Sequence, residues 1–267
     1  NSASRKLFAC GMRFISRLAW LGWLVALCAA LGVAQQADVP ARGAFRQDAP
    51  SAARGAFDRA VMMSKAGKGA LAQALLAEAL RIYPDYFDAH LALGNELFKA
   101  GRLADALTEF EKARRINPRD DQVYLSTGLV LMQQKRYDVA ASVFADASLL
   151  NPDEPLHRLM RGVALIRQAS AIPRSGSKNF AAERDALYRR AEGALAQAFD
   201  LSGRKMPEVH LYRALIYEQR GERARSADEL EQYLQANSGA ENADAVREAI
   251  RKLRGPAASA GASSPPE

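Results

Sequence analysis

Apolar and polar positions alternate along residues 53–237 with helical spacing, in short stretches separated by Gly, Asn and Pro. One such stretch is typical of the rest, because its apolar residues recur three and four positions apart on both sides of a glycine. Its residues in order are His90, Leu93, Gly94 and Leu97, then Gly101, then Leu103, Ala106, Leu107, Phe110 and Ala113, then Asn117 and Pro118. This order predicts a helix, a turn, a second helix and a stop.

The same stretch recurs, since Pro84, Pro118 and Pro152 stand 34 residues apart. Between these prolines, small and bulky residues return to the same columns. The columns are Ala60, Gly94 and Gly128; Ala72, Ala106 and Ala140; Leu76, Phe110 and Phe144; and Ala79, Ala113 and Ala147. A Gly or Ala lets one helix backbone approach its neighbour, and a Leu or Phe fills the space beside it. The columns therefore predict helix pairs that stack in a row.

This combination of period, small residues, bulky residue and terminal proline resembles the tetratricopeptide repeat family. The resemblance covers about residues 53–237. It implies an all-α fold, a right-handed α-solenoid of about five helix-turn-helix repeats over residues 53–254. His90 departs from the family pattern, which usually has an aromatic residue in that column.

The fourth unit contains an insertion. Gly162 follows Pro152 on schedule, but the small residue of the second helix, Ala191, comes 17 residues late. The inserted segment lies near 168–187, and we expect a loop in its first half, around Pro173, and a helical extension in its second half. Insertions in repeat proteins often emerge on a binding face, so this segment is one candidate for partner contact. The alternative, which the sequence favours equally, is a longer turn that binds no partner.

The C-terminal part continues the pattern and then ends it. A fifth unit spans about 207–237, with Ser226 where Ala is usual. Residues 241–254 form an amphipathic pattern closed by Gly255, which predicts a capping helix with a charged outer face. The tail, residues 255–267, has too few apolar residues to pack and is expected to be disordered.

The N-terminal 34 residues have a different character. Four basic residues precede an apolar run, Leu18–Ala34, and no acidic residue occurs before Asp38. This layout is typical of a secretory signal peptide cut after Ala34, followed by a linker over 35–52. The alternative is a retained membrane anchor, because the run approaches the length needed to span a bilayer.

Charge and cysteine content narrow the function classes. The net charge is +7, but four of the basic residues lie in the leader, which leaves +3 for the remainder. A mixed surface of this kind and an export signal argue against a nucleic-acid partner. Both cysteines, Cys10 and Cys28, also lie in the leader. The rest of the chain has no thiol for a disulfide, a zinc site or covalent catalysis.

The three histidines favour packing over chemistry. His90 and His210 occupy the same column, which the family fills with packed aromatic residues, and His157 lies in another unit. No metalloprotease helix, phosphate-binding glycine loop or nucleophile elbow occurs. We therefore expect no catalytic residue, no metal and no cofactor, and no enzymatic activity. A deep polar pocket with clustered ionisable groups would indicate the opposite.

The resemblance also implies a binding groove, because the first helices of successive repeats line a concave surface in this family. The positions expected to face it are Phe57, Leu91, Asn95, Phe98, Lys99, Leu125, Leu129, Met132, Val163, Ile166 and Arg167. An apolar floor with a partly basic edge suits an extended or helical peptide with apolar anchors and some acidic residues. The alternative is that several of these residues only pack helix against helix.

These expectations define an exported adaptor, periplasmic or extracytoplasmic, that binds a protein or peptide partner in its groove. A membrane-tethered structural component of a multi-protein envelope assembly is the alternative, and contact with the membrane is expected only if the apolar leader is retained.

Overall fold

The computed structural model describes residues 49–174 and 178–255, and over these ranges the chain forms eleven helices and no strand. The helices are α3 (Ser51–Lys65), α4 (Gly69–Ile82), α5 (Phe87–Lys99), α6 (Leu103–Ile116), α7 (Asp121–Gln133), α8 (Tyr137–Leu150), α9 (Pro155–Ala171), α10 (Lys178–Leu201), α11 (Glu208–Arg220), α12 (Arg223–Ala236) and α13 (Ala243–Arg254). The expectation of an all-α fold is confirmed.

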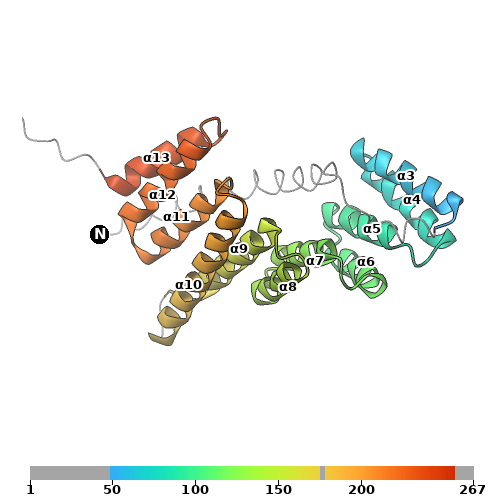
Figure 1. Ribbon diagram of the computed structural model, residues 1–267, viewed down its shortest axis with the longest axis horizontal. Coiled ribbons are helices and arrows are strands. Elements are labelled where there is room, and N and C mark those ends of the chain that lie inside the picture. Colours follow the sequence, from blue (N-terminus) through green and yellow to red (C-terminus); the bar gives the residue numbers. More distant parts are fainter. Residues whose placement is uncertain (1–48, 175–177, 256–267) are drawn as a thin grey trace, which may run out of the picture. The chain divides into compact units, whose positions relative to one another are not determined.

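Each helix packs chiefly against its neighbours in sequence. The pairs are α3 with α4, α5 with α6, α7 with α8, α9 with α10 and α11 with α12, and α13 packs against α12 (Figure 1). The second helix of each pair also contacts the first helix of the next. Five helix pairs and a last single helix match the repeat array predicted from the columns.

The small and bulky columns interlock within each pair. A Cβ atom on Gly94 would lie 2.4 Å from Phe110 Cε1, and one on Gly128 would lie 2.4 Å from Phe144 Cε1. In the fourth pair a Cβ on Gly162 would approach Leu195 to 3.0 Å. The bulky side chain therefore occupies the space that a missing methyl group leaves, as the columns predict.

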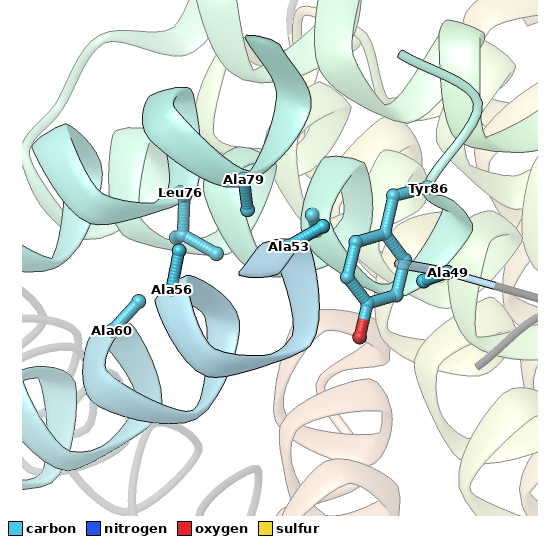
Figure 2. Packing of buried hydrophobic residues seen from close by; sticks show 8 residues of the cluster. Ala49, Ala53, Ala56, Ala60, Leu76, Ala79 and Tyr86 are labelled. Carbon is cyan, nitrogen blue, oxygen red and sulfur yellow. The ribbon is translucent and has the colours of Figure 1, made fainter. Parts of the chain in front are cut away.

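The first pair uses a smaller version of the same contact. Ala60 takes the place of the glycine, and Leu76 takes the place of the phenylalanine. Figure 2 shows Ala56 and Ala60 of α3 close to Leu76 of α4, with the ring of Tyr86 beside Ala53. All of these side chains are buried. A row of alanines on α3 thus lets α4 approach closely.

The first three repeats close in the same way. The N–H groups of Tyr83, Asn117 and Asn151 donate to the carbonyl oxygens of Ala79, Ala113 and Ala147, which ends the second helix just before the proline. The proline carbonyl then accepts a side-chain hydrogen bond from six residues further on: His90 Nε2 to Pro84 O at 2.8 Å, Tyr124 Oη to Pro118 O at 3.0 Å, and an Arg158 nitrogen to Pro152 O. A histidine, a tyrosine and an arginine therefore make the equivalent contact at three successive repeats.

The insertion in the fourth unit lengthens both helices of its pair. Helix α9 continues through Ala171, so residues 168–171 are helical where the sequence favoured a loop. Helix α10 begins at Lys178 and has 24 residues, whereas α4, α6, α8 and α12 each have 14. Pro173 lies in the short connection between the two helices.

The expected signal peptide or anchor, most of the linker and the C-terminal tail lie outside the described residues. Within the described part of the linker, Ser51 and Ala52 already belong to α3. No helix among residues 49–174 and 178–255 combines the length and the apolar character needed to cross a bilayer.

Candidate functional site

The eleven expected groove residues all lie on first helices of the pairs. Phe57 is on α3; Leu91, Asn95, Phe98 and Lys99 are on α5; Leu125, Leu129 and Met132 are on α7; and Val163, Ile166 and Arg167 are on α9. Their spacing of three and four residues on each helix places them on a shared face of that helix.

The exposure of these side chains differs along the row. Leu125, Leu129, Val163 and Ile166 are only 2%, 7%, 6% and 1% exposed. The other apolar members, which are Phe57, Leu91, Phe98 and Met132, are partly exposed, as is Asn95. The apolar side chains that a partner can reach in this structure therefore lie mainly on α3 and α5, with Met132 on α7.

The basic edge of the row is compensated at Lys99. Lys99 Nζ lies 2.7 Å from Glu96 Oε1, which also accepts a hydrogen bond of 2.6 Å from Ser64 Oγ. Glu96 is only 6% exposed, and Gln73 donates to its backbone oxygen. Lys99 at the predicted basic edge is therefore already part of an ion pair. The signal that sequence reasoning missed is a glutamate three residues before the lysine on the same helix.

The inserted segment attaches to the fifth pair. Arg220 of α11 forms ion pairs with Asp185 at 3.1 Å and Glu192 at 2.9 Å, both on α10. Its guanidinium also lies 5.9 Å from the ring centre of Tyr188. The lengthened α10 thus has a defined partner within the chain.

A second contact joins the connection after α9 to the end of the groove columns. Arg174 donates a hydrogen bond to Gln219, which occupies the same column as Lys99. Burial raises the pKa of the neighbouring Glu218 above its usual value, and the positive charges of Arg174 and Arg223 offset part of this effect. The predicted edge therefore ends in a polar contact made by the insertion.

Two of the histidines are buried beside glutamates. His90 Nδ1 lies 2.7 Å from Glu109 Oε2, and His210 Nδ1 lies 2.7 Å from Glu229 Oε2. In each case the first helix of a pair supplies the histidine and the second supplies the glutamate. The glutamates were not identified from the sequence, although each follows its histidine by 19 residues in both units.

His157 on α9 is fully buried, with Nε2 3.3 Å from Asp121 Oδ2 of α7. Burial lowers the pKa of His157, and the Asp121 and Glu154 carboxylates offset only part of this effect. Across residues 49–174 and 178–255, no three His, Cys, Asp or Glu side chains gather in a way that could hold a metal ion.

Stacked helix pairs with interlocking small and bulky residues define this molecule as an α-helical repeat protein. The sequence model of the tetratricopeptide repeat matches residues 63–121, 91–155 and 125–198, which together span half of the chain. The chain therefore belongs to the tetratricopeptide repeat family, as its columns predict. Among curated protein sequences, no match was found.

Solved structures with the same fold include a fragment of MamA from Desulfovibrio magneticus RS-1, at 16% identity and a TM-score of 0.60, which covers 72% of this chain and 99% of that one. YrrB, described as a tetratricopeptide protein with an unusual peptide-binding site, shares 16% identity at a TM-score of 0.54, covering 72% of this chain and 90% of its own. PilF from Pseudomonas aeruginosa shares 20% identity at a TM-score of 0.58, covering 76% of this chain and 84% of its own. At these identities the likeness establishes the fold.

Proposed function

We propose that this protein is an exported adaptor that binds a segment of a partner protein in the groove formed by the first helices of its repeats. Tetratricopeptide proteins are in general non-catalytic scaffolds for protein–protein interaction, and the family assignment supports this class of function. The peptide-binding site of YrrB, which has the same fold, supports a peptide as the bound form.

The observation that carries the proposal is the partly exposed apolar row on α5 and α7. Leu91 and Phe98 on α5 and Met132 on α7 present apolar surface on groove-facing columns. Large apolar side chains of this kind act as anchors for a partner's apolar residues. Asn95 lies between Leu91 and Phe98 on the same face of α5, and in this proposal its amide group, which can both donate and accept hydrogen bonds, holds the backbone of a bound segment.

The leader supports export as the cellular setting of this function. Its basic start and apolar run, Leu18–Ala34, have the layout of a signal peptide. In this proposal the mature protein begins at Gln35 and works in the periplasm or another extracytoplasmic space.

A second candidate function uses the same segment differently. If the apolar run is retained, the repeats become a membrane-tethered structural component of an envelope assembly. Sequencing the N-terminus of the protein purified from cells separates the two functions. A start at Gln35 in the soluble fraction supports the exported adaptor, and an intact leader in the membrane fraction supports the tethered component.

A photo-crosslinking amino acid placed at residue 98 tests the groove in living cells. We expect a discrete crosslinked partner at this position. A second protein, with the crosslinking amino acid at residue 132, should capture the same partner and should lose it when Phe98→Glu is introduced. Leu149 on α8, which is 79% exposed and lies on a second helix, is the matched control position. Equal crosslinking at residues 98 and 149 contradicts the groove assignment, provided that circular dichroism shows unchanged helix content.

A further inference from the structure

A crevice of about 590 Å³ lies between α4 and α6, which are the second helices of two successive pairs, and α5 forms its floor. Its volume falls within the range of roughly 300–1,000 Å³ that is common for ligand-binding pockets. The residues that matter for its chemistry are Leu80 and Arg81 from α4, Leu93 from α5, and Lys112, Arg115 and Ile116 from α6.

This crevice is distinct from the groove. His90 and Leu93 line it, whereas Leu91 and Phe98 belong to the groove row on the same helix. Successive residues of an α-helix are rotated by about 100°, so Leu93 projects about 140–160° away from Phe98 and Leu91, and His90 projects about 80–100° away from them. A ligand in the crevice therefore leaves the groove free.

The polar groups at the floor of the crevice are satisfied within the protein. His90 Nε2 donates to Pro84 O at 2.8 Å, and His90 Nδ1 lies 2.7 Å from Glu109 Oε2. Lys112 Nζ donates to the other oxygen of Glu109 at 2.8 Å. Glu109 is 9% exposed. Glu109 is therefore paired within the protein, since Lys112 donates to one of its oxygens and His90 lies against the other.

The rim, in contrast, carries an excess of exposed positive charge. Arg81, Lys112 and Arg115 are exposed, and Asp85 is the one exposed carboxylate in the lining. Arg115 Nε lies 3.5 Å from Glu111 Oε1, and Glu111 also forms an ion pair with Arg114. Arg81, in contrast, has no ion pair within the described part of the chain. Leu80, Leu93 and Ile116 are partly exposed between these cations. The crevice thus combines an apolar centre with a basic rim.

We propose that this crevice is a second binding site, for a peptide segment in which one apolar side chain is flanked by carboxylates. The apolar side chain lies on Leu93 between Leu80 and Ile116. The flanking carboxylates face Arg81 and Arg115, whose guanidinium groups pair with a carboxylate through two parallel hydrogen bonds. The protein then contacts two different segments at once, one in the groove and one in the crevice.

The probe for this site is a fluorescein-labelled peptide of sequence Gly-Asp-Leu-Asp-Gly with an amidated end, and its control replaces both Asp by Asn. Fluorescence polarisation with the full-length chain is expected to show at least about tenfold tighter binding of the acidic peptide. Arg81→Glu is expected to weaken this binding about tenfold. Arg136→Glu, which changes an exposed cation just before α8 that does not line the crevice, and Phe98→Glu in the groove row are expected to leave it unchanged.

Any of four results overturns the proposal. The first three are equal binding of the acidic peptide and its Asn control, equal binding to the Arg81→Glu and parent chains, and loss of binding in Phe98→Glu. Displacement of the peptide by short single-stranded DNA to the same extent in the parent and Arg81→Glu chains also overturns it, because that behaviour indicates general attraction of polyanions. Circular dichroism of each variant establishes that the helices are intact.

Discussion

Gly128→Ala tests the interlock between the small and bulky columns. The added methyl group would lie 2.4 Å from Cε1, 2.7 Å from Cζ and 2.8 Å from Cδ1 of Phe144. Ordinary van der Waals contact begins near 3.4 Å, so the ring has to withdraw by about 1 Å. The ring is fully buried and has little room to move.

The expected magnitude is the difference between two effects. Overpacking of a well-packed core costs about 1–3 kcal/mol. Alanine is favoured over glycine in a helix by about 1 kcal/mol, which offsets part of that cost. Gly193→Ala in α10 isolates the second effect, because a Cβ there meets no atom within 4 Å. Gly193→Ala should therefore stabilise the protein. The free energy of unfolding of Gly128→Ala should be about 1–3 kcal/mol lower than that of Gly193→Ala.

Phe144→Leu supplies the compensating change. The double variant Gly128→Ala/Phe144→Leu recreates the Ala60 and Leu76 combination of the first pair. We expect it to be more stable than the sum of the single effects by about 0.5–3 kcal/mol, the usual coupling between residues in contact. Thermal and urea unfolding monitored by circular dichroism measure the stability of the parent protein and of the four variants. If Gly128→Ala stabilises the protein as much as Gly193→Ala does, the interlock does not set the helix spacing.

Two further predictions concern charged and titratable side chains. Arg220→Met removes the shared partner of Asp185 and Glu192 and should lower the free energy of unfolding by about 1.5–3 kcal/mol. Arg225→Met, which removes an exposed i,i+3 ion pair, is the control and should have little effect. Equal unfolding midpoints of the two variants would contradict the anchoring role of Arg220. Burial holds the pKa of His157 below its ordinary value of 6.5, so between these two values the unfolded chain binds more protons. The free energy of unfolding should therefore fall as the pH drops below 6.5, and His157 can contribute at most about 1.4 kcal/mol per pH unit to this fall. If the free energy of unfolding of His157→Gln depends on pH with the same slope, another group is responsible.

The repeat columns were predictable because they record steric exclusion between neighbouring backbones. At Gly94 and Gly128 the space for a methyl group is already filled by a phenylalanine ring. Few other residues fit such a position, so the constraint appears directly in the sequence at a fixed period. The helix pairs and their order followed from this one feature.

The histidine and glutamate pairs were not predictable in the same way. His90 and Glu109 meet across two helices, and no local spacing rule joins residues 19 positions apart. Only the recurrence of the pair at His210 and Glu229 could have indicated it. The insertion was misjudged for a different reason, because Pro173 disfavours helix only at the residue just before it and leaves residues 168–171 free to continue α9.

The groove columns state which side of each helix a residue faces, and they do not determine its exposure. Phe98 and Ile166 share one column, yet Ile166 is 1% exposed and Phe98 is partly exposed. The column is set by helical geometry alone, whereas the exposed fraction depends on everything that surrounds the side chain. For this reason an experiment on the groove begins more safely at Phe98 than at Ile166.

Helix α5 supports both proposed binding sites, and Gly94 fixes its position. Leu91 and Phe98 belong to the predicted groove row, and Leu93 lines the crevice from another side of the helix. Gly94 lies against the ring of Phe110 on α6, the helix that supplies Arg115 and Ile116 to the crevice. A change at Gly94 that moves α6 relative to α5 would therefore also move Arg115 and Ile116 relative to Leu93 at the floor of the crevice. The geometry of the proposed crevice therefore depends on one steric contact between a glycine and a phenylalanine.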